Sequence, residues 1–468
     1  MIYNKIKSAT LKKLQQIVGE ANVLFDPENL ANYGHDHTEK LLFLPEVVVK
    51  PRTPEEISEI LIIANKELIP VTPRGAGTGL SGGALPVYGG IILSMERFNE
   101  ILEIDERNLQ ATVEPGVINE VFQNAVKELG LFYPPDPASK GSCFLGGNVA
   151  ESAGGPKCVK YGTTRDYILN LEVVLPTGEI IFTGANTLKN STGYNITQLM
   201  VGSEGTLGIV TKIIVKLLPH PKHDLLILVP FRSLDEACSS VSELFRAGFI
   251  PSSMELMERD ALEWVSRYFE SSAVKIENDI QAHLLIEVDG NDLDVLRKEI
   301  EAIAELMSKY NTGDILFADS AAQKQELWKL RRRINEAVTS NSTSKELDSV
   351  VPRAELPKLV KGVKQIGENY KFRTVCYGHA GDGNIHIRII KGDLTEEQWK
   401  GQYIKNAISE IFVLCKNLNG TISGEHGIGL IQQEYMGIIF SEKALNIQKN
   451  IKQVFDPKRI LNPGKIFA

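Results

Sequence analysis

Three histidines and one glutamate fall in two short glycine-flanked motifs of this 468-residue chain. The stretch CYGHAGDGNIHIRII at 376–390 predicts a strand, a tight turn and a second strand. Such a hairpin lets His379 and His386 face each other, and TISGEHGIGL places Glu425 and His426 side by side farther along. Two histidines and a carboxylate that leave coordination positions open form a divalent-metal site suited to Lewis-acid chemistry.

A purely structural role for these histidines is the alternative, since a single histidine near a turn usually serves the fold. The chain has only eight histidines, and three of them lie in these two motifs. On the residues alone, a functional site and a structural role are about equally good interpretations.

A predicted helix near 327–340, LWKLRRRINEAVTS, carries three consecutive arginines. Consecutive helical residues point about 100° apart, so Arg331, Arg332 and Arg333 cannot all face one pocket. A solvated basic surface is the default for two of them. A planar guanidinium that does face a pocket is suited to a substrate carboxylate.

Other stretches must provide the elements that position these residues, and the densest in glycine is PRGAGTGLSGG at 73–83. Its glycines at 77, 79 and 82 match the dinucleotide pattern G-x-G-x-x-G, which requires a following helix. Here ALPVYGGIILSM follows and predicts a strand. A loop between strands can still hold a pyrophosphate on its N–H groups, although a structural glycine turn explains this loop alone equally well.

Two further patches are rich in small residues. The stretch 133–162 has little periodicity, and so long an irregular segment inside a compact domain is usually functional or disordered. We favour the functional interpretation, because its small residues permit close approach to a flat ligand. The third patch, VGSEGTLGIVTKIIVKLLP, leads into a β-rich run.

Composition limits the classes of function. The chain has 51 Lys and Arg against 59 Asp and Glu, a net charge of −8 that gives no case for nucleic acid as a partner. Its five cysteines are far apart and never form C-x-x-C, which argues against a disulfide framework, a zinc knuckle or an iron–sulfur cluster. We read the N-terminus as an amphipathic helix and find no run of 18 apolar residues. We therefore expect a cytoplasmic protein that is at most peripheral at a membrane.

Taken together, PRGAGTGLSGG, PPDPAS with GGNVAESAGG, KYGTTRDYILNLEVVLPTGE and GSEGTLGIVT resemble the FAD-binding domain of the vanillyl-alcohol oxidase (PCMH-type) superfamily. The resemblance is to its D-lactate dehydrogenase, glycolate oxidase and D-2-hydroxyglutarate dehydrogenase branch, and it covers almost the whole chain in order. It implies an α+β fold with a two-subdomain FAD-binding domain over 1–220. A cap domain with a mainly antiparallel sheet would span 221–425, and residues 426–468 would return to the FAD-binding domain.

The resemblance also implies an FAD cradle. Relatives that attach the flavin covalently often carry a histidine in the first loop, where this chain has Thr78, so we expect noncovalent FAD. The C-terminal stretch FDPKRILNPGKIF resembles the ending of the family, which implies that Asn462 lies near the flavin, although a surface turn at 462–464 is an equally good explanation. The implied FAD-binding residues are Arg74, Gly75, Ala76, Gly77, Thr78, Gly79, Leu80, Ser81, Pro135, Ser142, Gly146, Asn148, Gly155, Gly162, Ile209 and Asn462.

The catalytic residues carry over in the same way. The resemblance implies that His379, His386 and Glu425 bind a divalent metal, Zn or Mn, and that His426 is the catalytic base. It assigns the substrate carboxylate to Arg331. The reaction would convert a 2-hydroxy acid into a 2-oxo acid: His426 removes the hydroxyl proton while the α-hydrogen leaves as hydride to flavin N5.

The substrate is predicted from positions at which this chain differs from the D-2-hydroxyglutarate enzymes of the same branch. The D-2-hydroxyglutarate enzymes place Thr and Lys where this chain has Asn335 and Glu346, and Asn at Arg388. Exchange of Lys for Glu argues against the same dicarboxylate pose, although Arg388 could hold a second anion in its own way. We therefore expect a short monocarboxylate, D-lactate or glycolate.

The alternatives are a D-2-hydroxyglutarate dehydrogenase, a non-redox flavin transferase of the alkylglycerone-phosphate synthase type, and a subunit that works only with an iron–sulfur partner. The sequence leaves open the electron acceptor, which could be an electron-transfer flavoprotein, a quinone, a cytochrome or an iron–sulfur subunit. The sequence also does not determine whether the protein forms a homodimer.

Overall fold

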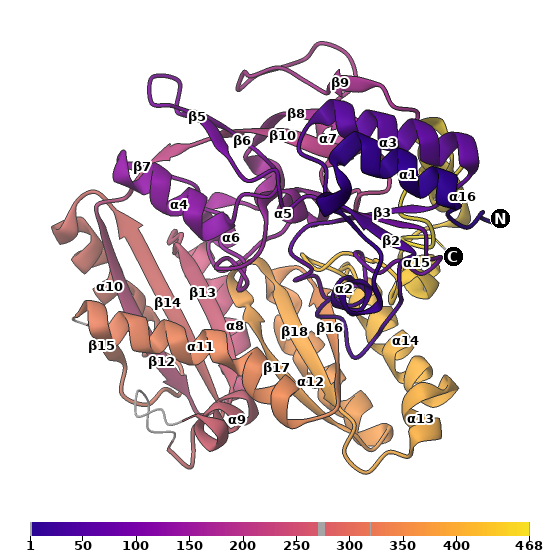
Figure 1. The fold of residues 1–468 in the computed structure, drawn as a ribbon. Coiled ribbons are helices and arrows are strands. Elements are labelled where there is room, and N and C mark those ends of the chain that lie inside the picture. Colours follow the sequence, from indigo (N-terminus) through magenta and orange to yellow (C-terminus); the bar gives the residue numbers. More distant parts are fainter. Residues whose placement is uncertain (1, 270–276, 319, 468) are drawn as a thin grey trace. The chain divides into compact units, whose positions relative to one another are not determined.

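The computed structural model describes residues 2–269, 277–318 and 320–467, and the chain divides into two compact units (Figure 1). The first unit comprises Met1–Gly154, Thr163–His220 and Glu425–Ala468. The second comprises Gly155–Gly162 and Pro221–Gly424. Residues 155–162, which the sequence analysis assigned to the FAD-binding domain, thus pack with the second unit.

A four-stranded sheet and two helices form one half of the first unit. The strand order is β1 (Val23–Leu24), β2 (Val47–Val49), β4 (Ile91–Ser94), β3 (Val71–Arg74), with β2, β4 and β3 parallel. Apolar residues of α1 (Ser8–Val18) and α3 (Pro54–Glu67) share one buried core with this sheet. Helix α3 begins at Pro54, because Thr53 accepts the Glu56 N–H and proline suits the first helical turn.

An antiparallel five-stranded sheet forms the other half, in the order β5 (Ile101–Asp105), β6 (Gln110–Val113), β10 (Ile209–Lys216), β8 (Ile168–Val174), β9 (Ile180–Phe182). A two-stranded ribbon pairs β7 (Leu131–Phe132) with β11 (Leu218–Pro219). The stretch 133–162 contains two short helices, α5 (Leu145–Glu151) and α6 (Cys158–Tyr161), within its loops. The other helices of this unit are α2 (Pro27–Tyr33), α4 (Asn119–Glu128), α7 (Ile196–Met200), α15 (Met436–Ile439) and α16 (Glu442–Phe455).

The C-terminal stretch of the first unit adds to the edge of the four-stranded sheet. The Val71 N–H donates to the Ile460 carbonyl at 2.8 Å, and the Asn462 N–H donates to the Val71 carbonyl at 2.7 Å. Residues that lie about 390 positions apart in sequence are therefore neighbours at the strand that leads into the glycine loop.

The second unit is built on a seven-stranded, fully antiparallel sheet, which confirms the predicted α+β architecture with a mainly antiparallel sheet. The strand order is β15 (Leu316–Ala318), β12 (His223–Phe231), β14 (Ala282–Gly290), β13 (Ser253–Glu258), β17 (Arg373–His379), β18 (Asn384–Ile390), β16 (Ser344–Val350).

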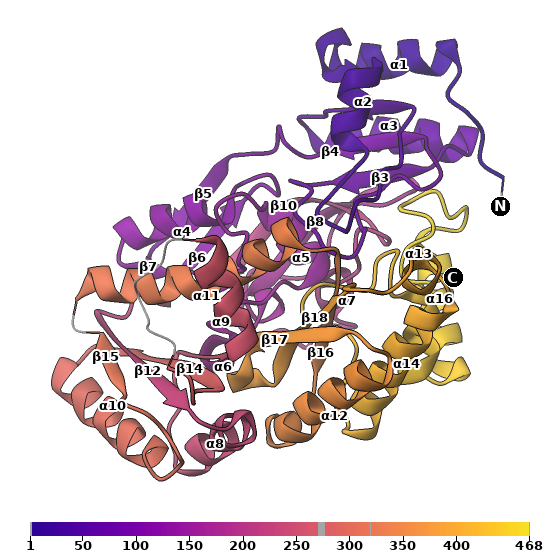
Figure 2. The ribbon, with the colours of Figure 1, turned by 90° about the horizontal axis from the view of Figure 1, so that it is seen from below.

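Helices cover both faces of this sheet, as Figure 2 shows. Helices α9 (Arg259–Tyr268) and α11 (Ala321–Asn341) share a core with one face, and α11 buries Leu327, Leu330 and Ile334 at helical spacing. The opposite face carries α8 (Leu234–Arg246), α10 (Leu293–Met307), α12 (Leu356–Asn369) and α14 (Gln402–Asn417), with α13 (Glu396–Lys400) beside α14.

The short helix α6 belongs to the second unit for an electrostatic reason. Lys157 pairs with Glu287, and the Lys160 ammonium lies 2.6 Å from Asp289 Oδ1. The Tyr161 hydroxyl donates to the same Asp289 oxygen at 2.8 Å. Both carboxylates are buried on β14, so they require these partners. This pairing is not predictable from local sequence, because the partners lie about 130 residues apart.

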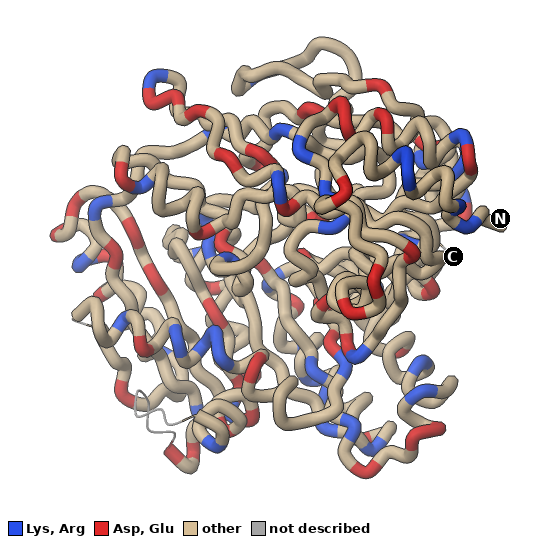
Figure 3. Tube along the Cα trace, in the orientation of Figure 1, with Lys and Arg blue, Asp and Glu red and all other residues tan. Residues whose placement is uncertain are grey.

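Other global features agree with the sequence. All five cysteines are free thiols. Figure 3 shows acidic and basic residues interspersed along both units. Over the described ranges, no helix combines the length and the apolar character needed to cross a membrane.

The buried His283 on β14 makes acid stability testable. Burial, and secondarily Arg259, lowers its pKa from 6.5 to about 4. Between these pH values the unfolded chain binds a proton that the folded chain does not, so stability is lost as the pH falls from 6.5 to 4. At 1.36 kcal/mol per pKa unit this amounts to about 3 kcal/mol. We predict that His283→Leu loses less stability than the wild type between pH 7 and pH 4 in urea unfolding.

The matched comparison is His223→Leu, the same substitution on the neighbouring strand β12. Equal acid losses in wild type and His283→Leu would contradict the prediction.

Candidate functional site

The hairpin of β17 and β18 brings two of the predicted metal ligands together. Tyr377 pairs with His386 and His379 pairs with Asn384 across the hairpin. The His379 and His386 ring centroids lie 5.3 Å apart, and both side chains are buried. The turn needs a glycine at Gly383, where φ is +86° and a Cβ would lie 2.0 Å from the Val351 carbonyl oxygen.

A fully buried glutamate on the adjacent strand β13 orients two of the predicted site residues. Glu255 Oε1 lies 2.8 Å from His379 Nδ1, and Glu255 Oε2 lies 2.7 Å from Arg331 Nη2. Burial raises the pKa of Glu255, but its interactions with His379 and Arg331 outweigh burial and hold the pKa at about 2. Sequence reasoning missed this residue. The available signal was an acidic residue inside the apolar strand SSMELME.

The three arginines of α11 separate as their helical spacing requires. Arg331 is buried, and its guanidinium lies over the Tyr377 ring at 5.3 Å. Arg332 stacks on Trp328 of its own helix and Arg333 on Phe269. Arg331 is therefore the arginine of this run that reaches the histidine hairpin.

The predicted substrate residue Arg388 is already engaged by neighbours. Glu346 lies opposite Arg388 across β16 and β18, and its carboxylate pairs with the Arg388 guanidinium. The Asn335 side-chain oxygen also accepts from Arg388, and the Tyr377 hydroxyl donates to that same oxygen at 3.3 Å. Arg388 is 5% exposed, so its charge is balanced inside the protein.

A second buried carboxylate, Asp348 on β16, binds the chain at Gly424, where the second unit ends. Asp348 accepts hydrogen bonds from the Asn384 side chain at 2.7 Å and from the Gly424 N–H at 2.8 Å. Its Oδ1 lies 3.7 Å from His386 Nδ1. Because Glu425 is the next residue after Gly424, Asp348 fixes the chain one residue before a predicted metal ligand. Sequence reasoning missed Asp348 as well.

In the first unit, the glycine loop carries buried polar groups that suit an anionic ligand. Among the described residues, Arg74 Nη1 and Ser81 Oγ are buried and have no hydrogen-bond partner. Burial lowers the pKa of Arg74. Leaving such groups unsatisfied is costly, so their arrangement fits a bound polyphosphate.

Two glycines of the cradle face open space. A Cβ added at Gly79 or Gly147 would meet no heavy atom of the described chain within 4 Å. The packing of the protein itself therefore does not require glycine at these positions, whereas close approach of a ligand would. Both observations fit the expected FAD.

Asn462 ties the C-terminal stretch to this loop. Its side-chain amide donates to the carbonyls of Gly83 at 2.9 Å and Glu204 at 2.8 Å. The Leu430 N–H donates to the Ser81 carbonyl at 2.8 Å, so the segment that follows His426 also joins the glycine loop.

The remaining predicted FAD-binding residues are dispersed. Asn148 on α5 donates to the Asn119 side chain at 3.1 Å, and the Pro135 carbonyl accepts from that same Asn119 at 3.1 Å. Ile209 packs in the buried core of the four-stranded sheet. Ser142 donates to the Ser139 carbonyl, Gly146 packs against Pro115, and Gly155 and Gly162 bound the α6 segment of the second unit.

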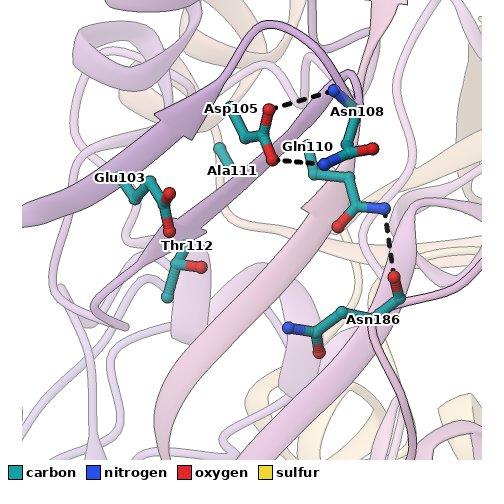
Figure 4. Close-up of a pocket in the computed structure, with 7 residues that line it drawn as sticks. All are labelled: Glu103, Asp105, Asn108, Gln110, Ala111, Thr112 and Asn186. Atoms are coloured by element: carbon teal, nitrogen blue, oxygen red, sulfur yellow. Dashed lines mark hydrogen bonds between the residues drawn. The ribbon is translucent and has the colours of Figure 1, made fainter.

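A polar depression of about 270 Å³ on β5 and β6 is not part of this site (Figure 4). Asp105 is bound to Asn108 of its own turn, and Gln110 donates to the Asn186 carbonyl. The residues that line it are Glu103, Asp105, Asn108, Gln110, Ala111, Thr112 and Asn186, none of which was predicted to be functional.

Comparison with known proteins defines the class. Residues 220–466 match the family "FAD linked oxidases, C-terminal domain", and residues 45–184 match "FAD binding domain". The chain therefore belongs to the FAD-linked oxidases, and the predicted family is confirmed.

Its relatives share nearly the full length. The chain is 38% identical to the glycolate oxidase subunit GlcD of Bacillus subtilis, over 98% of this chain and 96% of the relative. It is 37% identical to a D-lactate dehydrogenase of Anaerostipes hadrus, over 99% and 98%. A solved p-cresol methylhydroxylase superposes with a TM-score of 0.80 at 19% identity, over 97% of this chain and 96% of that one, which establishes the fold. The protein is an FAD-dependent oxidoreductase.

The open space at Gly79 gives a test of the cradle. We predict that Gly79→Ala leaves the melting temperature of the apoprotein unchanged but weakens FAD binding about tenfold, because crowding a close contact typically costs 1–3 kcal/mol. Fluorescence titration of apoprotein with FAD measures the affinity.

Gly437 on α15 is the control, since a Cβ there also meets nothing within 4 Å of the described chain and the residue lies outside the cradle. Gly437→Ala should bind FAD like the wild type. An unchanged affinity in Gly79→Ala would contradict the placement of FAD against this loop.

Proposed function

We propose that the protein oxidises a short D-2-hydroxy acid, with D-lactate or glycolate favoured, to the 2-oxo acid with noncovalent FAD. The observation that carries the proposal is Glu255, which holds a histidine and an arginine beside each other in a buried site. The names of the glycolate oxidase and D-lactate dehydrogenase relatives support the same class of substrate.

The proposed roles divide between binding and proton transfer. Arg331 binds the substrate carboxylate, and Glu255 with the Tyr377 ring keeps its guanidinium in place. His426 accepts the substrate hydroxyl proton on an imidazole nitrogen. Bound FAD supplies the hydride acceptor for this chemistry.

We propose His379, His386 and Glu425 as ligands of a divalent metal, Zn or Mn. A metal-binding histidine usually directs its other ring nitrogen to a carboxylate, and His379 Nδ1 lies 2.8 Å from Glu255. Asp348 and Glu346 lie 3.7 and 3.8 Å from His386 Nδ1. These neighbours fit a metal site, and the metal would polarise the substrate hydroxyl.

The pairing of Arg388 supports a monocarboxylate substrate. Glu346 and Asn335 both engage Nη2 of Arg388, and the Glu346 carboxylate already balances the Arg388 charge, which disfavours binding of a second carboxylate there. Glu346 adds a negative charge that would repel one. We therefore propose that Arg388 lies at the substrate and limits its size, which disfavours D-2-hydroxyglutarate.

The remaining assignments are proposals of the same kind. We propose residues 1–220 with 426–468 as the FAD-binding domain and 221–425 as the substrate domain. The relative GlcD is named as a subunit, which supports an electron-accepting protein partner. Five free thiols support a cytoplasmic location.

The proposed reaction is tested by anaerobic bleaching of the bound flavin with a panel of D- and L-2-hydroxy acids. We predict bleaching by D-lactate or glycolate, and at least 100-fold slower bleaching in His426→Ala, which should retain FAD because only the base is lost. Stopped-flow absorbance at the flavin band measures both.

His223→Ala is the matched histidine control and should bleach at the wild-type rate. Wild-type protein that no hydroxy acid bleaches would point to the non-redox transferase. Normal bleaching by His426→Ala would remove His426 as the base.

The metal proposal is tested at Glu255. We predict that Glu255→Gln weakens Mn²⁺ or Zn²⁺ binding by 10- to 100-fold, the usual effect of losing a carboxylate that orients a metal-binding histidine. Isothermal titration of the chelator-stripped holoenzyme measures the affinity.

Glu258→Gln is the control from the same strand, because Glu258 is also buried and pairs with Lys364 at 2.7 Å, away from the histidines. It should lower the melting temperature without changing metal affinity. Equal losses of metal affinity in the two variants would contradict the role of Glu255.

A further inference from the structure

Glu204 lies in a conformation that glutamate rarely adopts. Its φ is +52°, in the left-handed region, and it stands between Gly202 and Gly205 in the GSEG segment. Its carboxylate is also removed from water, since the residue is 6% exposed. A left-handed backbone conformation and a buried carboxylate both cost stability. Glycine would avoid both costs at this position, so the glutamate side chain must have a specific role.

That task is to hold the loop that follows His426. Glu204 Oε1 accepts the Ile428 N–H at 2.8 Å, and Glu204 Oε2 accepts the Gly429 N–H at 2.7 Å. Both carboxylate oxygens are thus committed to consecutive backbone amides, in charge-assisted bonds that are stronger than neutral ones.

The backbone of Glu204 connects this loop to the FAD cradle of the same unit. Its N–H donates to the Ala150 carbonyl on α5 at 2.8 Å. Its carbonyl accepts from the Asn462 side chain, which also binds the Gly83 carbonyl of the glycine loop. One residue therefore links α5, the glycine loop and the residues that follow His426.

The loop has little freedom around these bonds. At Gly427 φ is +78°, and a Cβ would lie 2.0 Å from Glu151 Oε2 and 3.1 Å from Glu204 Oε1. The residue immediately after His426 thus packs directly against two buried carboxyl groups. Loss of the Glu204 contacts would free the backbone at Ile428 and Gly429, directly after the tightly packed Gly427.

We propose that Glu204 is a positioning residue for His426, which places the imidazole relative to the FAD cradle through the Ile428 and Gly429 amides. This inference rests on the proposed function, since His426 is the base in that proposal. The role of Glu204 is not apparent from the sequence, because its partners lie 224 and 225 residues away.

The test is a double-mutant cycle on the FAD-loaded protein. Glu204→Gln retains one acceptor oxygen and turns an amide NH₂ toward the second N–H. We expect it to retain FAD and to slow anaerobic flavin reduction 10- to 100-fold, with less than a twofold change in the half-saturating substrate concentration. In a His426→Ala background the same change should slow the residual reduction less than twofold, because Glu204 acts through His426.

Lys371→Gly separates backbone strain from the carboxylate contacts, since Lys371 also has a positive φ of +55°. It should leave flavin reduction unchanged, whereas Glu204→Gly should slow it at least as much as Glu204→Gln.

Equal slowing by Glu204→Gln with and without His426, or loss of FAD in proportion to activity, would overturn the proposal in favour of a structural role. Normal reduction by His426→Ala alone would instead refute the base assignment in the proposed function.

Discussion

A carboxylate removed from water must be compensated by charges or hydrogen-bond donors, and this constraint organises the candidate site. Glu255 is fully buried on β13, and it satisfies the requirement with His379 and Arg331. Its two oxygens therefore fix the ring orientation of one predicted ligand and the guanidinium of the predicted substrate clamp. Any displacement of β13 relative to β17 or α11 would leave a buried charge without its partner, so the geometry of the site is coupled to the stability of the sheet.

The same constraint operates on both sides of the Glu425–His426 pair. In the second unit, Asp348 accepts the Gly424 N–H just before the pair. In the first unit, Glu204 accepts the N–H groups of Ile428 and Gly429 just after it. The chain passes from one unit to the other at Glu425, so each unit holds one end of the motif with a buried carboxylate. At Gly427 an added Cβ would lie 3.1 Å from Glu204 Oε1, so glycine allows the backbone to approach this acid closely.

The sequence predicted those parts of the site that depend on residues close together in the chain. Strand, turn and strand around His379 and His386 follow from short-range periodicity, and the separation of Arg331 from Arg332 follows from helix geometry. Glu255 could not be found in this way, because its histidine partner lies 124 residues away. The grouping of residues 155–162 with the second unit was not predictable for the same reason, since β14 supplies the partners of their lysines. Buried acidic residues whose partners are distant in sequence can be recognised only when the strand pairing of the fold is known.

The charge balance of the second-unit cluster bears on how it could bind a carboxylate at all. Arg331 and Arg388 supply two positive charges, whereas Glu255, Glu346 and Asp348 supply three negative ones. With both histidines neutral, as metal ligands must be, these five groups sum to −1 and would repel a carboxylate. Glu425, the third proposed metal ligand, brings the sum to −2, and a divalent cation would return it to zero. In the proposed function, the metal would therefore remove the repulsion that otherwise keeps a substrate carboxylate out of this cluster.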